Sequence, residues 1–453
     1  MGVPLPMNKI RITIVTAFGF AGLGLLLWAT APSGQVVNAA EIALSPRPEP
    51  DPAVGREAYR DSCARCHGET GAGDGWDAAK MFPRPRNLAE GIFKFRTTES
   101  GTPPTDEDLF HTITHGLPGS RMPDFSRLPE ELRWQLVYYV KSLSPVFESD
   151  QPVPIDLGSD PGPGRADLAK GKAVYEMLQC AACHGVEGRA DGPSAPTLVD
   201  NWGNPIRAAN LTQGWTYRSG AEAKDIVARL LTGLDGTPMP SYNGAVPVED
   251  AWQLAHYIRS LQVQAEFSDR IRAARTDGPL PADPADPAWG KAPQARVLLS
   301  ANLYKEREVL PVSVTSVGIQ ALYNGSEVAL RLNWDDPDNS TDPVPDAAAV
   351  AFMPDRRMKW ELGSLRAWPP APDAPKLDWL RWQSREQSSA VHAAGQWAVV
   401  LKRPLAGSGE NGAQIGRDAG GRPTLIGVMV WNGGNGETGR HRSNSIWLDL
   451  SLD

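Results

Sequence analysis

Two stretches of sequence decide the fold, and they are Cys63-Ala64-Arg65-Cys66-His67 and Cys180-Ala181-Ala182-Cys183-His184. The second stretch lies 117 residues after the first, and the same offset relates two further pairs: Gly116-Leu117 to Gly233-Leu234, and Met122-Pro123 to Met239-Pro240. A period of this length is too long for a solenoid repeat. The sequence therefore predicts two tandem domains with one fold.

An amphipathic segment follows the repeated methionine in both copies. In the first copy the apolar residues recur at helical spacing, namely Leu132, Leu136, Tyr139, Val140 and Leu143. Trp134-Gln135-Leu136 in this segment corresponds to Trp252-Gln253-Leu254 in the second copy. Each domain is thus expected to end in a helix, and we predict that both domains are all-α.

The pattern Cys-x-x-Cys-His is the attachment signature of c-type haem. Two thiols at this spacing add to the porphyrin vinyl groups, and the adjacent histidine reaches the iron from the proximal face. A zinc site would need four ligands around the metal, and a disulfide between the paired thiols would leave the repeated histidine unexplained. The predicted haem-binding residues are Cys63, Cys66, Cys180 and Cys183, with His67 and His184 as iron ligands.

Met122 and Met239 each lie 55 residues after their motif histidine and just before the last helix. With these features both copies resemble the small monohaem cytochrome c family, in which a loop methionine ligates the iron opposite the histidine. The resemblance implies that Met122 and Met239 are the sixth ligands. Because protein then fills both axial positions, electron transfer is favoured over catalysis. Histidines without a histidine counterpart in the other copy are interpreted as surface or packing residues: His111, His115 and His256.

Proline-rich stretches divide the chain at residues 45–52, 151–164 and 276–287. Such stretches lack backbone donors and apolar side chains, so they act as extended spacers. The predicted blocks are two cytochrome c domains at residues 53–147 and 165–266, and a third domain at residues 290–453.

The third block changes to an alternating pattern. Apolar residues alternate from Val317 to Tyr323 and again from Val328 to Trp334, and Asn324-Gly325 between them predicts a type I′ turn. Further strands are expected at residues 347–353, 397–402, 424–431 and 445–452. We predict an antiparallel β-sandwich or barrel.

Several stretches of this block resemble the haem-b subunit of type II dimethylsulfoxide-reductase-like molybdoenzymes, the ethylbenzene dehydrogenase γ-subunit family. They are Leu332-Asn333-Trp334-Asp335-Asp336-Pro337-Asp338, Pro345 to Phe352, Leu377 to Trp382, Val428 to Gly433 and Ser445-Ile446-Trp447. The resemblance implies a haem b held by a methionine and a lysine.

This sequence departs from the family at both haem-b ligands, because Leu362 and Arg442 stand at those places. Leucine has no donor atom and arginine stays protonated. We expect a haem-free domain kept for docking. Met358 and His441 are the open alternative as ligands of a third haem, a haem b.

The N-terminus reads as a targeting segment. Lys9 and Arg11 precede an uncharged stretch over residues 12–31, and Val37-Asn38-Ala39 offers a cleavage site. The stretch is also about long enough to span a bilayer, so residues 1–40 are either a signal peptide or a retained membrane anchor. Both readings place the remaining chain in the periplasm. The net charge of −8 argues against a nucleic-acid partner.

These patterns predict a periplasmic dihaem cytochrome that is not itself an enzyme. Its expected partners are a respiratory oxidoreductase, of the molybdenum type by the resemblance, and a downstream cytochrome or terminal oxidase. The direction of electron flow stays open. Two other classes are kept open as well: a dihaem enzyme such as a peroxidase or a small-molecule dehydrogenase with one open haem, and a binding module in which the β domain recognises carbohydrate or an envelope protein.

Overall fold

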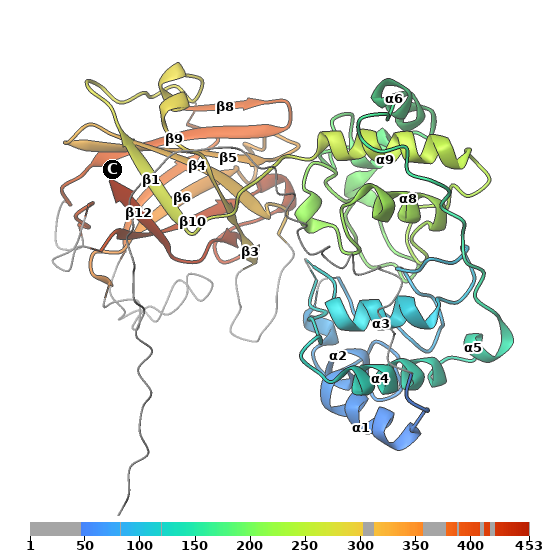
Figure 1. The fold of residues 1–453 in the computed structure, drawn as a ribbon. Coiled ribbons are helices and arrows are strands. Elements are labelled where there is room, and N and C mark those ends of the chain that lie inside the picture. Colours follow the sequence, from blue (N-terminus) through green and yellow to red (C-terminus); the bar gives the residue numbers. More distant parts are fainter. Residues whose placement is uncertain are drawn as a thin grey trace, which may run out of the picture. The chain divides into compact units, whose positions relative to one another are not determined.

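The computed structural model describes residues 47–81, 83–118, 120–301, 312–356, 377–386, 389–407, 412–416 and 422–452. The predicted targeting segment at residues 1–40 and the candidate ligand Met358 lie outside this range. Among the described residues, no helix combines the length and the apolar character that crossing a membrane requires. Helices build the first two blocks, and strands build the last one (Figure 1).

The first helical block contains five α-helices and a short 3-10 turn among its described residues. They are α1 (Pro52–Ser62), α2 (Ala64–His67), η1 (Ala78–Lys80), α3 (Asp106–His115), α4 (Glu130–Ser142) and α5 (Val146–Ser149). Helix α1 begins where the Asp51 carboxylate accepts hydrogen bonds from the backbone N–H groups of Ala53 and Val54, at 2.9 and 3.2 Å. A capping box of Thr105 and Asp108 starts α3.

The second helical block repeats the order of the first four α-helices, with one additional 3-10 turn and, among its described residues, no counterpart of α5. Its elements are α6 (Leu168–Met177), α7 (Ala181–His184), η2 (Ala195–Thr197), η3 (Gly214–Thr216), α8 (Ala223–Thr232) and α9 (Val248–Leu261). The predicted terminal helices are therefore confirmed as α4 and α9. Both α3 and α8 end at a glycine with positive φ, Gly116 at 63° and Gly233 at 66°.

The first and last helices of each block cross at a glycine. A Cβ atom at Gly55 in α1 would lie 2.8 Å from the carbonyl oxygen of Gln135 in α4. Gly171 in α6 meets Gln253 in α9 in the same way. Apolar residues then fill the interior of each block, including Leu136 and Leu254 at equivalent places, both with no exposed surface. The two blocks thus share their packing as well as their helix order.

The last block is rich in strands. They are β1 (Arg270–Arg275), β2 (Ala295–Leu298), β3 (Ser300–Ala301), β4 (Ser316–Tyr323), β5 (Glu327–Asp335), β6 (Ala347–Phe352), β7 (Asp378–Gln383), β8 (Ala390–Ala393), β9 (Gln396–Pro404), β10 (Thr424–Trp431), β11 (Ser443–Asn444) and β12 (Leu448–Leu452). The described part of this block also contains two 3-10 turns, η4 (Pro287–Lys291) and η7 (Gly433–Asn435).

The described strands form one mixed sheet with the order β3-β11-β10-β12-β1-β4-β5-β9-β8, while β2 pairs with β4, and β6 pairs with β10 and β7. The prediction of a purely antiparallel sheet is wrong, because β1 runs parallel to both β12 and β4. This strand also lies before residue 290, so the sheet includes residues ahead of the predicted boundary. Only Ile271 and Ala273 of β1 are fully buried. The strand has three arginines and three apolar residues, of which only Ile271 is large, so its alternation is too weak to reveal a strand.

The hairpin of β4 and β5 is confirmed in antiparallel register, with Ile319 opposite Leu332 and Ala321 opposite Leu330. Its turn differs from the predicted type I′, since Gly325 has a φ of 89° whereas Asn324 is not among the described residues with positive φ. The Asn324 side chain instead accepts hydrogen bonds from the backbone N–H groups of Ser326 and Glu327.

The core of the sheet domain joins strands that are not hydrogen-bonded neighbours. Val317 and Leu330, from β4 and β5, belong to the same buried cluster as Phe352 and Val428, from β6 and β10. Trp397 of β9 packs against Trp382 of β7 with ring centroids 4.8 Å apart. Two parts of the sheet therefore face each other across one apolar core.

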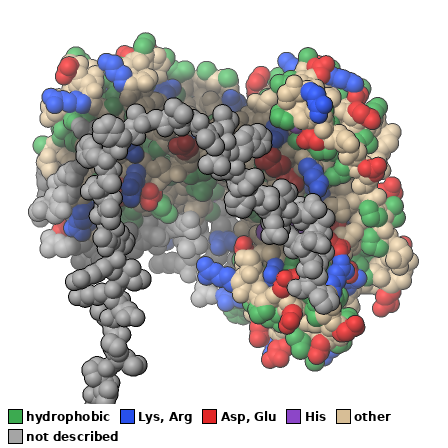
Figure 2. Space-filling view, in the orientation of Figure 1, with side chains coloured by type: hydrophobic (Ala, Val, Ile, Leu, Met, Phe, Trp, Pro, Cys, Tyr) green, Lys and Arg blue, Asp and Glu red, His purple; other side chains and the backbone are tan. Residues whose placement is uncertain are grey.

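The surface of the helical blocks carries charges of both signs. On the visible face of these blocks, Lys and Arg side chains are interspersed with Asp and Glu side chains (Figure 2). The net charge of −8 is consequently not gathered into one acidic patch on that face.

Candidate functional site

The first Cys-x-x-Cys-His motif forms a single helical turn. Cys63 precedes α2, and its carbonyl oxygen accepts a hydrogen bond from the backbone N–H of His67 at 2.9 Å. In the second domain Cys180 and His184 are joined in the same way, also at 2.9 Å. The predicted residues are thus brought together in both domains, with each histidine one turn after the first cysteine.

All four cysteines are free thiols in partly exposed positions. Burial raises the pKa of Cys63 to about 12 and that of Cys180 to about 11. Redox-active dithiols and thiolate metal ligands have lowered pKa values and basic or metal neighbours. Cys63 and Cys180 lack the lowered pKa that is typical of a redox-active dithiol.

A backbone carbonyl holds each motif histidine. Nδ1 of His67 lies 3.0 Å from the carbonyl oxygen of Arg86, and Nδ1 of His184 lies 2.8 Å from that of Ala209. Burial lowers the pKa of both imidazoles. A neutral ring whose Nδ1–H donates to a carbonyl keeps the lone pair on Nε2, which is the state that ligates a metal.

The loop after each motif is closed by the same hydrogen bonds. The Tyr59 hydroxyl donates to the carbonyl oxygen of Gly68 at 2.9 Å, and the Tyr175 hydroxyl donates to that of Gly185 at 2.6 Å. The sequence reasoning missed these tyrosines and the two carbonyl partners of the histidines. Tyr59 and Tyr175 stand near the repeat offset and could have been found from it, whereas a backbone carbonyl leaves no signature in the sequence.

The two methionine loops share one conformation. The backbone N–H of Leu117 donates to the carbonyl oxygen of Met122 at 3.1 Å, and the backbone N–H of Leu234 donates to that of Met239 at 3.1 Å. Inside each loop a hydroxyl closes a tight turn, from Ser120 in the first domain and Thr237 in the second.

The second loop lies close to its cysteine motif. Met239 and Cys180 pack against the same apolar cluster. Tyr242 follows Met239 by three residues, and burial raises its pKa to about 12 with smaller contributions from Cys180 and Cys183. The thiols and the methionine loop of this domain therefore border one region, as residues around a shared haem must do.

The remaining histidines have other contacts. His256 is buried in α9, and its Nε2 lies 2.7 Å from Oδ1 of Asp160. Nδ1 of His115 lies 3.0 Å from the carbonyl oxygen of His111, and the two rings lie 4.3 Å apart. These contacts agree with the interpretation of all three as packing or surface residues.

Of the two candidates for a third haem, only His441 is described. Its neighbour Arg442 is buried and is held by the side chain of Asn444 at 2.8 Å and the carbonyl oxygen of Gly439 at 3.0 Å. The guanidinium also lies 5.5 Å from the ring centroid of Trp431. Arg442 thus has a structural role, and ligation by Met358 and His441 stays a hypothesis.

Two family models match the helical blocks. The model described as "Cytochrome C oxidase, cbb3-type, subunit III" matches residues 50–140, and the model described as "Cytochrome c" matches residues 168–262. The N-terminal half of the chain therefore contains two cytochrome c domains. Cytochrome c domains carry covalent haem c, and Cys63 with Cys66 and Cys180 with Cys183 fit its attachment motif.

The curated relatives are subunits of electron-transfer complexes. The cbb3-type cytochrome c oxidase subunit CcoP of Azospirillum sp. (strain B510) is 29% identical over 222 residues, which cover 46% of this chain and 62% of that protein. The chlorate reductase subunit gamma of Ideonella dechloratans is 27% identical over 188 residues, which cover 37% of this chain and 77% of that protein. The chain spans about three fifths of the length of the cbb3-type relatives it matches.

Solved structures also match this chain, and one of them covers the same share of it as the cbb3-type relative does. A chain of the reducing HAO-like protein complex of Kuenenia stuttgartiensis is 44% identical, with a TM-score of 0.45. The match covers 46% of this chain and 96% of that chain.

Proposed function

We propose that this chain is a periplasmic two-haem c-type cytochrome that transfers electrons as a subunit or partner of a respiratory oxidoreductase. One observation carries the proposal: in both cytochrome c domains the cysteine motif, the carbonyl-held imidazole and the methionine loop have the same hydrogen bonds. Two sites that are built alike and lie on one chain suit a relay better than a catalyst with one specialised centre.

In this proposal the four cysteines hold the porphyrins, His67 and His184 supply the proximal nitrogen, and Met122 and Met239 supply the thioether sulfur. A bound c-type haem takes up and releases one electron at its iron, at a potential that thioether ligation raises. Side chains on both faces leave no open coordination position for a substrate. The carrier role is therefore favoured over a peroxidase or dehydrogenase.

We further propose that the oxidoreductase partner is a molybdenum enzyme. The similarity to a chlorate reductase subunit gamma supports this, as does the resemblance of the C-terminal block to the molybdoenzyme γ-subunit family. In this proposal residues 290–453 dock the chain onto the larger enzyme without binding haem b. A downstream cytochrome or terminal oxidase is the second partner.

The haem content and spin state test the carrier role. Purified full-length protein should contain two covalent haems per chain in a pyridine haemochrome assay, and electron paramagnetic resonance of the oxidised protein should show two low-spin irons. A single covalent haem would contradict the two-centre proposal. A stoichiometric high-spin iron would instead favour the enzyme alternative.

The partner is tested separately. The tagged full-length protein is purified from the periplasmic and membrane fractions of its native host, and the metal content of the eluate is measured. Stoichiometric molybdenum in the eluate is the expected result. Recovery of terminal-oxidase subunits without molybdenum would overturn the proposed molybdenum partner and leave the carrier role intact.

A further inference from the structure

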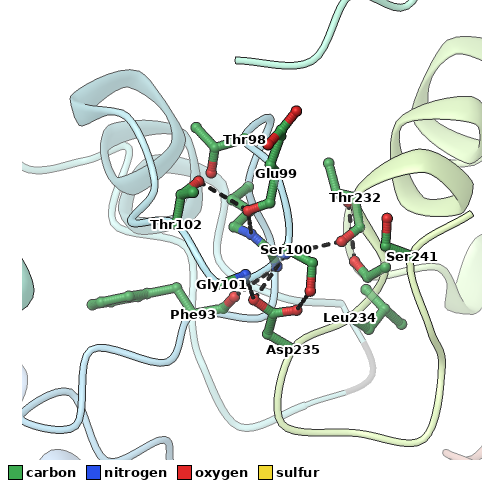
Figure 3. A network of polar contacts seen from close by, with 12 residues as sticks. Phe93, Thr98, Glu99, Ser100, Gly101, Thr102, Thr232, Leu234, Asp235 and Ser241 are labelled. Atoms are coloured by element: carbon green, nitrogen blue, oxygen red, sulfur yellow. Dashed lines mark hydrogen bonds and ion pairs between the residues drawn. The ribbon is translucent and has the colours of Figure 1, made fainter. Parts of the chain in front are cut away.

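A polar network joins the two cytochrome c domains. Its residues are Arg96, Ser100 and Gly101 of the first domain, together with Thr232 and Asp235 of the second. We call this set the inter-domain network; Figure 3 shows Asp235 directed toward Ser100 and Gly101. It connects the segment before α3 to the loop that carries Met239.

Arg96 is the buried centre of the inter-domain network, since its side chain has no exposed surface. Within its own domain the guanidinium donates to the carbonyl oxygens of Phe93 at 3.1 Å and Glu99 at 3.3 Å. Its Nη2 reaches across to the carbonyl oxygen of Thr232 and to Oδ2 of Asp235, both at 2.8 Å. A buried guanidinium with this many partners has one fixed geometry, because losing any partner leaves a buried donor unpaired.

Asp235 is held through both of its carboxylate oxygens by the first domain. Oδ1 accepts a hydrogen bond from the Ser100 hydroxyl at 2.7 Å, and Oδ2 accepts one from the backbone N–H of Gly101 at 2.9 Å in addition to the Arg96 ion pair. Charge-assisted hydrogen bonds of this kind are the strong ones. The carboxylate is thus fixed by three groups outside its own domain.

Asp235 also lies inside the methionine loop. The backbone N–H of its neighbour Leu234 donates to the carbonyl oxygen of Met239, and the carbonyl oxygen of Leu234 accepts from the backbone N–H of Thr237, both at 3.1 Å. A shift of Asp235 would therefore disturb the bonds that shape this loop. The equivalent position in the first domain is Pro118, which has no carboxylate.

We propose that Arg96 and Asp235 are positioning residues for Met239, so that the first domain fixes the methionine loop of the second. The inference rests on the proposed role of Met239 as an iron ligand. Its consequence is that the ligation and the reduction potential of the second centre depend on a side chain of the first domain. In the loop of Met122, Pro118 stands at the place of Asp235 and cannot form this ion pair.

The experiment uses the full-length, haem-loaded protein and four variants: Arg96→Gln, Arg96→Lys, Asp235→Asn and Ser100→Ala. The readouts are the sulfur-to-iron absorption of the oxidised protein and the two midpoint potentials. Arg403→Gln is the matched control, because Arg403 is equally a buried arginine, bonded to the carbonyl oxygens of Pro404 and Ala413 and paired with Asp378 at 2.6 Å, but within the sheet domain.

A positioning role and a simple charge effect predict different shifts of the midpoint potential in these variants. If the network positions Met239, Arg96→Gln and Asp235→Asn both lower one potential and both remove up to half of the absorption, while Arg96→Lys restores part of it. Ser100→Ala removes only one hydrogen bond at the surface and should show the same change at smaller size. This variant keeps the test possible even if Arg96→Gln does not fold. Arg403→Gln leaves both readouts unchanged.

A simple charge effect would shift the potential down in Arg96→Gln and up in Asp235→Asn, with the absorption retained. That result, or no change in any variant, would overturn the inference. Met239→Ala distinguishes a failure of the underlying proposal, because an unchanged absorption in this variant would show that Met239 is not a ligand at all.

Discussion

The two cytochrome c domains have similarly packed interiors. They differ in the contacts of the loop whose backbone carbonyl oxygen lies next to the motif histidine. In the first domain the asparagine after the histidine-binding carbonyl, Asn87, donates to Glu90 of its own domain at 2.7 Å. In the second domain the equivalent Asn210 donates to Asp335 at 3.0 Å, at the end of strand β5 of the sheet domain. The asparagine is thus the same in both domains, but its partner differs: the partner lies in the same domain in the first case and in the sheet domain in the second.

Asp335 is one of the residues that join the second domain to the sheet domain. Its carboxylate pairs with Arg189 at 2.7 Å and accepts hydrogen bonds from the side-chain amides of Gln213 at 2.6 Å and Gln396 at 2.7 Å. Together with the inter-domain network, this bracing holds the second domain on both its histidine side and its methionine side. The second domain therefore has contacts with both of its neighbours, and four sets of variants can test whether its centre depends on them.

Loss of haem attachment should show the largest difference between the two domains. The variants Cys63→Ala/Cys66→Ala and Cys180→Ala/Cys183→Ala should each retain one of the two covalent haems by pyridine haemochrome. The second variant should also lose more thermal stability and be cleaved faster by protease, because the domain it empties contacts both neighbours. Equal losses in the two variants would contradict this difference between the domains.

Loss of the proposed sixth ligand should affect the domains alike in the spectrum. Met122→Ala and Met239→Ala should each remove about half of the sulfur-to-iron absorption and lower one potential, since thioether ligation raises the potential of a c-type haem. Optical redox titration measures both effects. An unchanged spectrum in both variants would contradict ligation by methionine and would make His111, His115 and His256 the candidate iron ligands.

Loss of the hydrogen bonds made by Asn87 and Asn210 should change the reduction potential of one domain at a time. Asn210→Ala and Asp335→Asn should each destabilise the protein by about 1.5 to 3 kcal/mol, the usual range for hydrogen bonds to charged groups, and should shift only the potential of the second centre. Asn87→Ala should shift only that of the first. A double-mutant cycle in urea should show coupling between Asn210 and Asp335 but additivity between Asn87 and Asp335.

The smallest effect should be the same in both domains. Tyr59→Phe and Tyr175→Phe each remove one buried hydroxyl-to-carbonyl hydrogen bond, worth about 1 kcal/mol. Equal losses of unfolding free energy would support the identity of the two interiors. A difference well above the error of the measurement would show that the interiors have diverged as well.

The two cysteine motifs and the two methionine loops could be located because each occurs twice in the sequence. The terminal helices α4 and α9 followed from apolar spacing, and the β4–β5 hairpin followed from alternation. These signals are local, so a single sequence contains them in full.

The bracing could not be predicted, because it depends on residues far apart in the chain. Nothing in the sequence marks Asp335 among its acidic neighbours, and Arg96 looks like any surface arginine until folding buries it beside Asp235. Strand β1 was missed because its apolar alternation is too weak to mark a strand. The C-terminal block proposed for docking also contains the aromatic residues Trp360 and Trp368, which lie outside the described residues, and Trp379, which is part of β7.

The parallel pairing of β1 with β12 affects the order in which the protein matures. Ile271 lies opposite Leu450, so the strand that opens the sheet stays unpaired on that side until the last strand has been synthesised. Contacts of such long range form late during folding, whereas the helices of each cytochrome c domain meet within about a hundred residues. Each cytochrome c domain can therefore fold before the sheet closes.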